Sequence, residues 1–230
     1  MKAASVRWFL LGYVVLLVLL IAICSGSDEQ GIGIGLSWGN GNYSFSGAAP
    51  PWAIAFAVVS AGLYAVLFWS HVDATSKPMP HLFRRFVAGM VDWALGIMMS
   101  ATVVGLISIL IEYKQTGVFA WVINRQEPRP WDALEAVTGF FLVFAAMVVY
   151  MAVPLSRGKP TPGACIFGYC VMADEGSRLT FWFATLRALL GSVALLGWPC
   201  WILAYALKRD KNQGKFWLDA IFRTHAEFLT

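Results

Sequence analysis

Long apolar runs separated by short polar segments dominate the chain. Four of these runs are long enough to cross a bilayer as helices, and they cover residues 6–24, 52–70, 86–111 and 133–154. A fifth apolar run covers residues 183–207. The pattern predicts an all-α, polytopic transmembrane helix bundle with four firm spans and a fifth apolar segment that is either straight or re-entrant.

The first run has basic residues before it and small polar residues after it. Lys2 and Arg7 flank its N-terminal side, and Ser25-Gly26-Ser27 follow it. This arrangement allows either an uncleaved anchor or a cleaved signal peptide. A run of about 19 residues is longer than the usual apolar core of a signal peptide, which favours the uncleaved anchor.

The composition also indicates an integral membrane protein. Of the 230 residues, 59% are hydrophobic and 13% are charged, whereas a soluble domain carries about 25% charged residues. The 11 Trp and 7 Tyr are typical of aromatic belts at membrane–water interfaces. In a membrane protein a net charge of +4 mostly reports basic cytoplasmic loops. The partner that it indicates is therefore the lipid bilayer and not nucleic acid.

The distribution of Lys and Arg predicts which loops lie on the cytoplasmic side. Residues 25–50 contain neither and are rich in Gly, Ser and Asn, which predicts a flexible external loop. Residues 71–85 and 155–181 are basic loops and should lie inside. The N-terminus is then cytoplasmic.

The fifth run determines the side of the basic C-terminal tail. If residues 183–207 cross the membrane once, the 17 Lys and Arg divide as nine inside and eight outside. If the run is a re-entrant hairpin, the division becomes fourteen to three, which is the bias that the positive-inside rule expects. Gly191, Gly197 and Pro199 are places where the helix can break. The charges favour an inside tail, although the run makes only two short half-helices.

Two shorter patterns concern the loop 155–181 and the tail. Two apolar runs flank the turn signal Asp174-Glu175-Gly176, which predicts a small β-hairpin in the loop. In the tail, apolar residues gather on one side of a helix, which predicts either an amphipathic helix at the interface or an ordinary helix packed on the loop. That group consists of Trp217, Leu218, Ile221, Phe222 and Phe228.

Groups that could support catalysis or metal binding are sparse. The 4 Cys and 3 His are scattered and lack metal-ligand spacing. No Ser/His/Asp or Cys/His arrangement indicates nucleophilic catalysis. The glycines of the external loop do not follow a strand and open a helix, as a nucleotide site requires. The sequence therefore predicts no enzyme, no metal site and no cofactor.

One carboxylate lies inside an apolar run. Asp92 follows Arg85 by seven residues, so the two side chains share a face of the third span but lie about 10.5 Å apart along its axis. A charge at mid-bilayer costs about 2.5–3.5 kcal/mol on the insertion scale. Asp92 therefore needs a partner inside the bundle or a proton. Arg187, at a similar depth in the fifth run, is the predicted partner.

The order of the charged residues and glycine motifs resembles the RDD family of membrane proteins. In chain order the matching features are Arg85, Asp92, G-x-x-TPG from Gly158 to Gly163, Gly168-x-x-Val171, Arg187, and KRDKNQGKFWLDAIFRT with Asp219 and Thr224. The resemblance covers about residues 80–225. It implies that Arg85, Asp92 and Asp219 are the arginine and two aspartates of the family name.

The resemblance divides the chain into two parts. Two positions of this sequence differ from the family pattern. Residues 1–75 would form an N-terminal transmembrane hairpin with a Gly-rich external loop. Residues 76–230 would form an RDD-like membrane domain with the cytoplasmic loop 155–181 and the basic tail. Ala164 stands where the family usually has a basic residue, and Leu218 stands where a His is common.

The family has been linked to transport of unidentified ligands, to sodium–proton exchange and to accessory roles in membrane complexes. The chain is therefore expected to be either a non-enzymatic accessory or scaffold protein, or a small ion or solute transporter that uses Asp92. The expected location is the bacterial inner membrane, and the expected partners beyond lipid are another membrane protein or a second copy. The charged cluster of interest consists of Arg84, Arg85, Asp92, Arg187 and Asp219.

Overall fold

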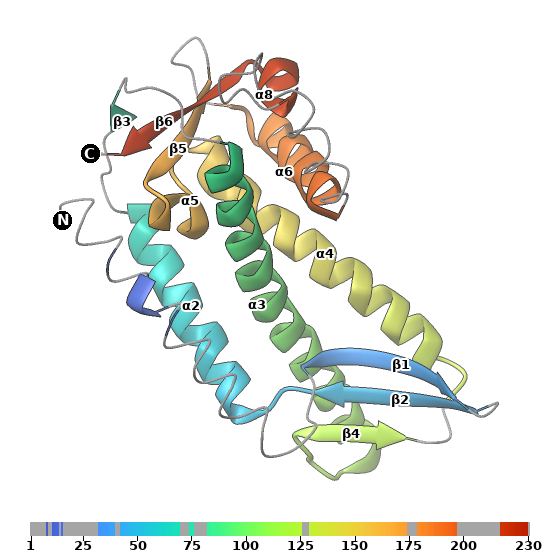
Figure 1. Cartoon of the computed structure of the whole chain (residues 1–230). Helices are drawn as coiled ribbons and strands as arrows, with labels where there is room; N and C mark the ends of the chain where they lie inside the picture. Colours follow the sequence, from blue (N-terminus) through green and yellow to red (C-terminus); the bar gives the residue numbers. More distant parts are fainter. Residues whose placement is uncertain are drawn as a thin grey trace. The chain divides into compact units, whose positions relative to one another are not determined.

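The computed structural model of the chain describes residues 8, 11–13, 15, 32–39, 42–69, 74–75, 82–125, 129–173, 179–196 and 217–229. The chain forms two compact units. Figure 1 draws the helices and strands, coloured along the sequence. Unit 1 comprises Met1–Val14, Tyr64–Ala94 and Val148–Thr230, and unit 2 comprises Val15–Leu63 and Leu95–Met147.

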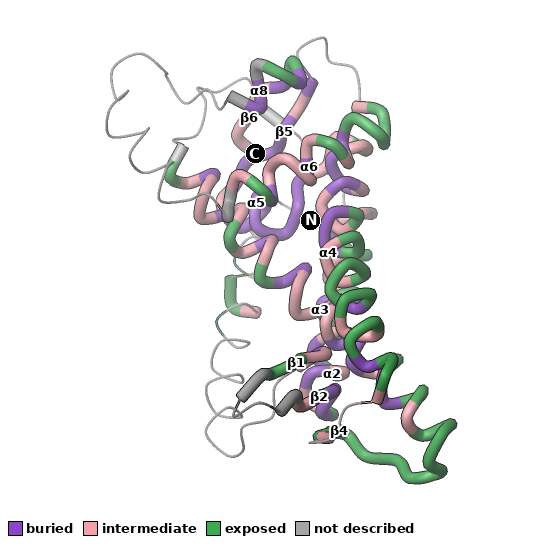
Figure 2. The backbone as a smooth tube through the Cα atoms, turned by 90° about the vertical axis from the view of Figure 1, so that its right-hand side faces the viewer, coloured by how far each residue is buried: buried purple, intermediate pink, exposed green. Residues whose placement is uncertain are grey.

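Three long apolar helices are the main elements of the described chain. They are α2 (Pro51–Trp69), α3 (Leu82–Thr116) and α4 (Asp132–Ser156). Each contains a segment long and apolar enough to cross a membrane. Figure 2 shows exposed positions along much of α4, and these include large apolar side chains such as Phe140 and Phe141. Such surfaces are unfavourable in water and suited to lipid.

The prediction of four firm spans is confirmed only in part, because three of the described helices qualify. Most of residues 6–24, the first predicted span, lies outside the described residues. The fifth apolar run begins as α6 (Phe181–Leu196), whose 16 residues are fewer than the roughly 20 that span a bilayer. Residues 197–207 lie outside the described part of the chain.

Unit 2 contains a three-stranded antiparallel sheet of β1 (Gly33–Gly39), β2 (Asn42–Ala48) and β4 (Val122–Arg125), in the order β1-β2-β4. The Gly-rich segment predicted to be a flexible loop therefore forms strands. Phe45 of β2 is fully buried in a cluster with Ile109 and Ile123. This apolar contact explains why the segment is ordered.

Unit 1 contains a second sheet built from three segments that are distant in the sequence. Its strands are β3 (Ala74–Thr75), β5 (Tyr169–Ala173) and β6 (Thr224–Leu229), all antiparallel, in the order β3-β6-β5. The all-α class is therefore wrong in detail: the described chain is mostly helical but carries two small sheets.

Two local predictions are corrected by this second sheet. The hairpin predicted around residues 174–176 does not form between the two runs beside it, because β5 pairs with β6 and the second run begins α6. The predicted tail helix is confirmed only for α8 (Trp217–Phe222), since the residues after it form β6. The tail thus packs on the loop 155–181 through strand pairing.

The β5–β6 pairing also places the last strand of the tail beside the loop 155–181. Tyr169 lies opposite Phe228 and Ala173 lies opposite Thr224, so the tail runs beside the loop that follows α4. A tail on the other side of the membrane could not make these backbone pairs. Residues 224–229 therefore lie on the same side of a membrane as β5.

Candidate functional site

Asp219 is a buried carboxylate shared by two arginines. It lies in α8 and is 4% exposed. Arg85 of α3 donates from Nη1 to Oδ2 at 2.6 Å and from Nη2 to Oδ1 at 2.9 Å. Arg187 of α6 donates from Nη2 to Oδ1 at 2.6 Å. One aspartate thereby joins three helices of unit 1.

Thr224 completes this cluster from the first position of β6. Its hydroxyl accepts from Nε of Arg187 at 3.3 Å and donates to Oδ1 of Asp219 at 3.2 Å. Arg223, between α8 and β6, has a φ of 48°, the left-handed conformation that often follows the last residue of a helix. This turn carries the chain from helix to strand and explains the five-residue spacing of Asp219 and Thr224.

The arginines determine the charge state of Asp219. Burial by itself raises the pKa of a carboxyl group, but the hydrogen bonds and charge of Arg85, followed by those of Arg187, outweigh it and hold the pKa of Asp219 below its ordinary value. Asp219 is therefore a carboxylate at neutral pH. Of the two adjacent arginines of α3, Arg85 forms the ion pair with Asp219.

Asp92 has different partners from those predicted. It lies in α3 and is 4% exposed. Its Oδ2 accepts from the hydroxyl of Thr161 at 2.5 Å, and its Oδ1 accepts from the backbone N–H of Gly163 at 2.7 Å. The prediction that Arg187 is the partner of Asp92 is wrong, because Arg187 binds Asp219 and Thr224 instead.

The TPG motif explains how Asp92 obtains these donors. Thr161 is the N-cap of α5 (Pro162–Ile166), and its hydroxyl accepts from the N–H of Ala164 at 3.3 Å. Pro162 occupies the first turn, where its missing N–H costs nothing. A Cβ on Gly163 would lie 2.2 Å from the carbonyl oxygen of Ala88 in α3. In this motif Thr161 caps α5, Pro162 begins the helix, and Gly163 allows α5 to lie close to α3.

Arg84, the remaining residue of the predicted cluster, lies against the sheet of unit 1. Its Cζ is 5.2 Å from the ring centroid of Phe228 in β6. This distance is within the range of a cation–π contact. Arg84 and Arg85, adjacent in the sequence, therefore both fasten α3 to the tail, one through β6 and the other through α8.

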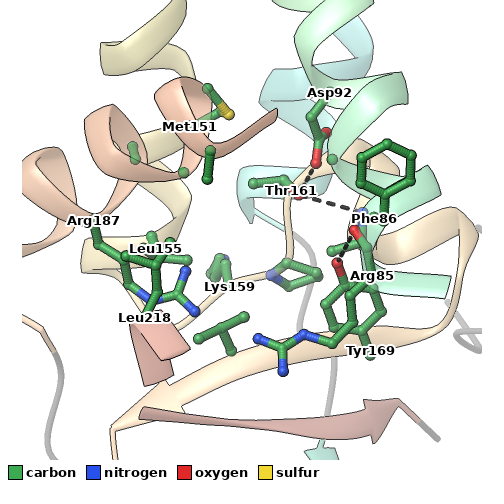
Figure 3. A pocket seen from close by; sticks show the side chains of 17 residues that line it. Arg85, Phe86, Asp92, Met151, Leu155, Lys159, Thr161, Tyr169, Arg187 and Leu218 are labelled. Atoms are coloured by element: carbon green, nitrogen blue, oxygen red, sulfur yellow. Dashed lines mark hydrogen bonds between the residues drawn. The ribbon is translucent and has the colours of Figure 1, made fainter. Parts of the chain in front are cut away.

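A cavity of about 160 Å³ lies beside these residues in unit 1 (Figure 3). Arg85 and Asp92 of α3, Arg187 of α6 and Thr161 line it. Lys159, which the sequence analysis did not single out, lines it too and donates to the carbonyl oxygen of Phe68. The cavity therefore brings together four of the charged residues of unit 1 with an apolar wall.

Tyr169 and Cys170, adjacent in β5, both have surroundings that favour a structural role. The hydroxyl of Tyr169 donates to the carbonyl oxygen of Arg85 at 3.5 Å. Burial, together with the charge of Glu227, raises the pKa of the Cys170 thiol to about 11, so it is a poor nucleophile at neutral pH. Within the described residues, no group of three His, Cys, Asp or Glu could hold a metal ion.

Unit 2 contains a further ionic network that the sequence analysis did not predict. Arg125 of β4 donates to Glu112 of α3 and to Asp132 of α4, in both cases at 2.7 Å. Asp132 is fully buried and also accepts from the backbone N–H of Arg129 at 2.8 Å. The network binds the loop between α3 and α4 to the two helices.

The three apolar helices and their exposed large apolar side chains indicate an integral membrane protein. The chain belongs to the RDD family, whose sequence profile matches residues 79–222 and thus more than half of the chain. No curated protein and no solved structure matches it. The family match covers all five residues of the predicted charged cluster.

Proposed function

We propose that the chain is a non-enzymatic membrane protein of the accessory or scaffold type, in which the RDD residues hold the membrane-side loops and the tail in one arrangement. The observation that carries this proposal is the engagement of the charged groups. Asp219 receives both Arg85 and Arg187, and Asp92 receives Thr161 and Gly163. Groups committed to internal contacts of this kind specify packing.

The distribution of basic residues supports this proposal, because it indicates on which side of the membrane the loops and tail of unit 1 lie. The loops and tail that meet in the sheet of unit 1 carry most of the Lys and Arg of the chain. The positive-inside rule favours the cytoplasmic side for them, with the N-terminus on the same side of a bacterial inner membrane. The expected partner, another membrane protein or a second copy, would then meet a surface of fixed shape on that side.

Asp92→Asn is the variant that tests the proposal. The amide nitrogen of Asn replaces one carboxylate oxygen, so either Thr161 or Gly163 loses its acceptor. A buried donor left without a partner costs about 1–3 kcal/mol, and a loss of this size lowers the amount of folded protein several-fold. We expect less chain, and proportionately less bound partner, after mild-detergent capture from native membranes.

The neighbouring Thr161 provides the matched controls. Thr161→Val removes the same hydrogen bond without touching the carboxylate and should reproduce the loss, whereas Thr161→Ser keeps the hydroxyl and should not. Mass spectrometry of the captured material measures both the chain and its partners. Recovery of the wild-type chain without any stoichiometric protein, partner or second copy, would contradict the accessory role.

A transporter of small ions or solutes is the second candidate, because Asp92 lines the cavity within a segment apolar enough to span the membrane. In that case Asp92→Asn would abolish sodium- or proton-driven flux into liposomes while the chain accumulates normally. Thr161→Val would leave Asp92 ionisable and retain flux. The same pair of variants therefore separates the two functions.

A further inference from the structure

The cavity of unit 1 combines an apolar wall with cationic side chains at the end of two candidate spans. Met151 and Leu155 come from the last turns of α4, and Phe86 comes from the first turns of α3. Ala188 and Gly191 add the wall from α6. The ends of spanning helices are the depth at which lipid head groups meet acyl chains.

The charges around the cavity sum to a positive value. Arg85, Arg187 and Lys159 line it, and so does Asp92, while Asp219 supplies one negative charge that both arginines share. The two oxygens of Asp92 already accept hydrogen bonds from Thr161 and Gly163. Three cationic side chains and two carboxylates thus leave one net positive charge beside the cavity.

Arg187 also has a donor that the internal contacts do not use. Its hydrogen bonds run from Nη2 to Asp219 and from Nε to Thr224. Within the described part of the chain, its Nη1 makes none. Figure 3 shows Arg187 and Arg85 entering from α6 and α3, with their guanidinium groups directed towards one another across the cavity. Oδ1 of Asp219 already accepts from both groups, so Nη1 of Arg187 is the donor that remains for an entering anionic oxygen.

We infer that this cavity binds the head group of an anionic phospholipid, with the acyl chains lying outside it against the apolar helices. A volume of about 160 Å³ is close to that of a cavity of about 150 Å³ that takes up one benzene, so a phosphate group fits and a whole lipid does not. Basic sites between spanning helices on the inner face attract anionic lipids. A scaffold and a transporter could both use such a site.

Native mass spectrometry of the delipidated full-length chain tests the inference. The probes are dioleoylphosphatidylglycerol, dioleoylphosphatidylcholine with the same chains and no net charge, and glycerol 3-phosphate as a head group without chains. We expect one phosphatidylglycerol per chain, bound at least about ten-fold more tightly than phosphatidylcholine. Glycerol 3-phosphate should not compete at equal concentration, because the chains contribute to binding.

Gly191→Leu fills the cavity and should abolish the preference for the anionic lipid. A Cβ at Gly191 has its nearest neighbour, Cδ1 of Leu218, at 3.9 Å, so the helix accepts the side chain. Gly62→Leu is the matched control, because a Cβ at Gly62 of α2 meets nothing within 4 Å. It makes the same substitution in an apolar helix and should leave binding unchanged.

A charge variant keeps the inference testable if Gly191→Leu fails to fold. Lys159 and Arg157 both lie beside the ring of Phe68, at 5.4 and 5.3 Å, but only Lys159 lines the cavity. Lys159→Gln should weaken phosphatidylglycerol binding about five-fold and Arg157→Gln should not. Equal binding of the two lipids, unchanged binding by Lys159→Gln, or binding of glycerol 3-phosphate as tight as that of the lipid would each overturn the inference.

Discussion

Asp219→Ala is expected to lower the stability of unit 1 by about 3–5 kcal/mol, because it leaves two buried guanidinium groups without their shared carboxylate. The side chains of Arg85 and Arg187 are 8% and 11% exposed, so both guanidinium groups are largely shielded from bulk water. Thermal unfolding in detergent measures the loss. Hydrogen–deuterium exchange of the β6 amides locates it, because α8 and β6 are held to α3 and α6 through Asp219 and Thr224.

Glu227→Gln is the matched control for this prediction. Glu227 lies in β6 and accepts from His225 at 2.9 Å, and both side chains are about a quarter exposed, at 24% and 26%. A pair of this kind contributes about 0–1 kcal/mol. If both variants shift the unfolding temperature equally, or if Asp219→Ala leaves β6 protected, the buried cluster does not hold the tail.

Gly163→Ala is the second change with a large expected effect. The added Cβ would lie 2.2 Å from the carbonyl oxygen of Ala88 and 2.8 Å from the carboxylate of Asp92. Since the first neighbour is helix backbone, α5 must move away from α3 and lose the hydrogen bond from Gly163 to Asp92. Overpacking together with that loss should cost about 3 kcal/mol, which thermal unfolding in detergent measures.

Gly191→Ala is the control for this prediction. It shows whether replacing a helix glycine is destabilising in general or only where α5 contacts α3. The Cβ has space in α6, and alanine favours a helix over glycine by about 1 kcal/mol. We expect unchanged or slightly raised stability. A Gly163→Ala chain that unfolds at the wild-type temperature would show that α5 does not rest on α3 as described.

The long helices could be predicted from the sequence because their apolar runs are long and continuous. The strands of unit 2 also left a signal, which the abundance of Gly, Ser and Asn obscured. Ile34, Leu36 and Trp38 alternate with small residues, and Asn40-Gly41 separates them from a second alternating run. Alternation on both sides of Asn-Gly is the strongest short-range indication of a hairpin, and it outweighs the composition.

The tail shows where periodicity can be misleading. Residues 217–222 follow the helical period, whereas Thr224, Ala226 and Phe228 alternate with His225 and Glu227. A helix drawn through all of them ignored this change of period. The change occurs at Arg223, and a single sequence does not reveal a positive φ at a residue other than glycine.

The partner of Asp92 was missed for a different physical reason. An opposite charge at equal depth is the partner that the sequence indicates, whereas the actual donors are neutral. The hydroxyl of Thr161 and the N–H of Gly163 stabilise a carboxylate without any cation. Both residues belong to the TPG motif, so their types were visible, but only the folded loop brings them to α3.

The tail pairs with the loop after α4, and the charged cluster holds it there. Cys170 lies directly opposite Glu227 in the β5–β6 register, and opposite residues of antiparallel strands are close enough for a disulfide. The most direct test introduces Glu227→Cys into a chain whose other three cysteines are alanine. The chain is then oxidised in membranes with copper–phenanthroline, and disulfide-linked peptides are identified by mass spectrometry. The account predicts a link between residues 170 and 227 that Asp219→Ala abolishes, and no link when Ile221→Cys, on α8, replaces Glu227→Cys. Equal linkage at both positions, or none at residue 227, would contradict it.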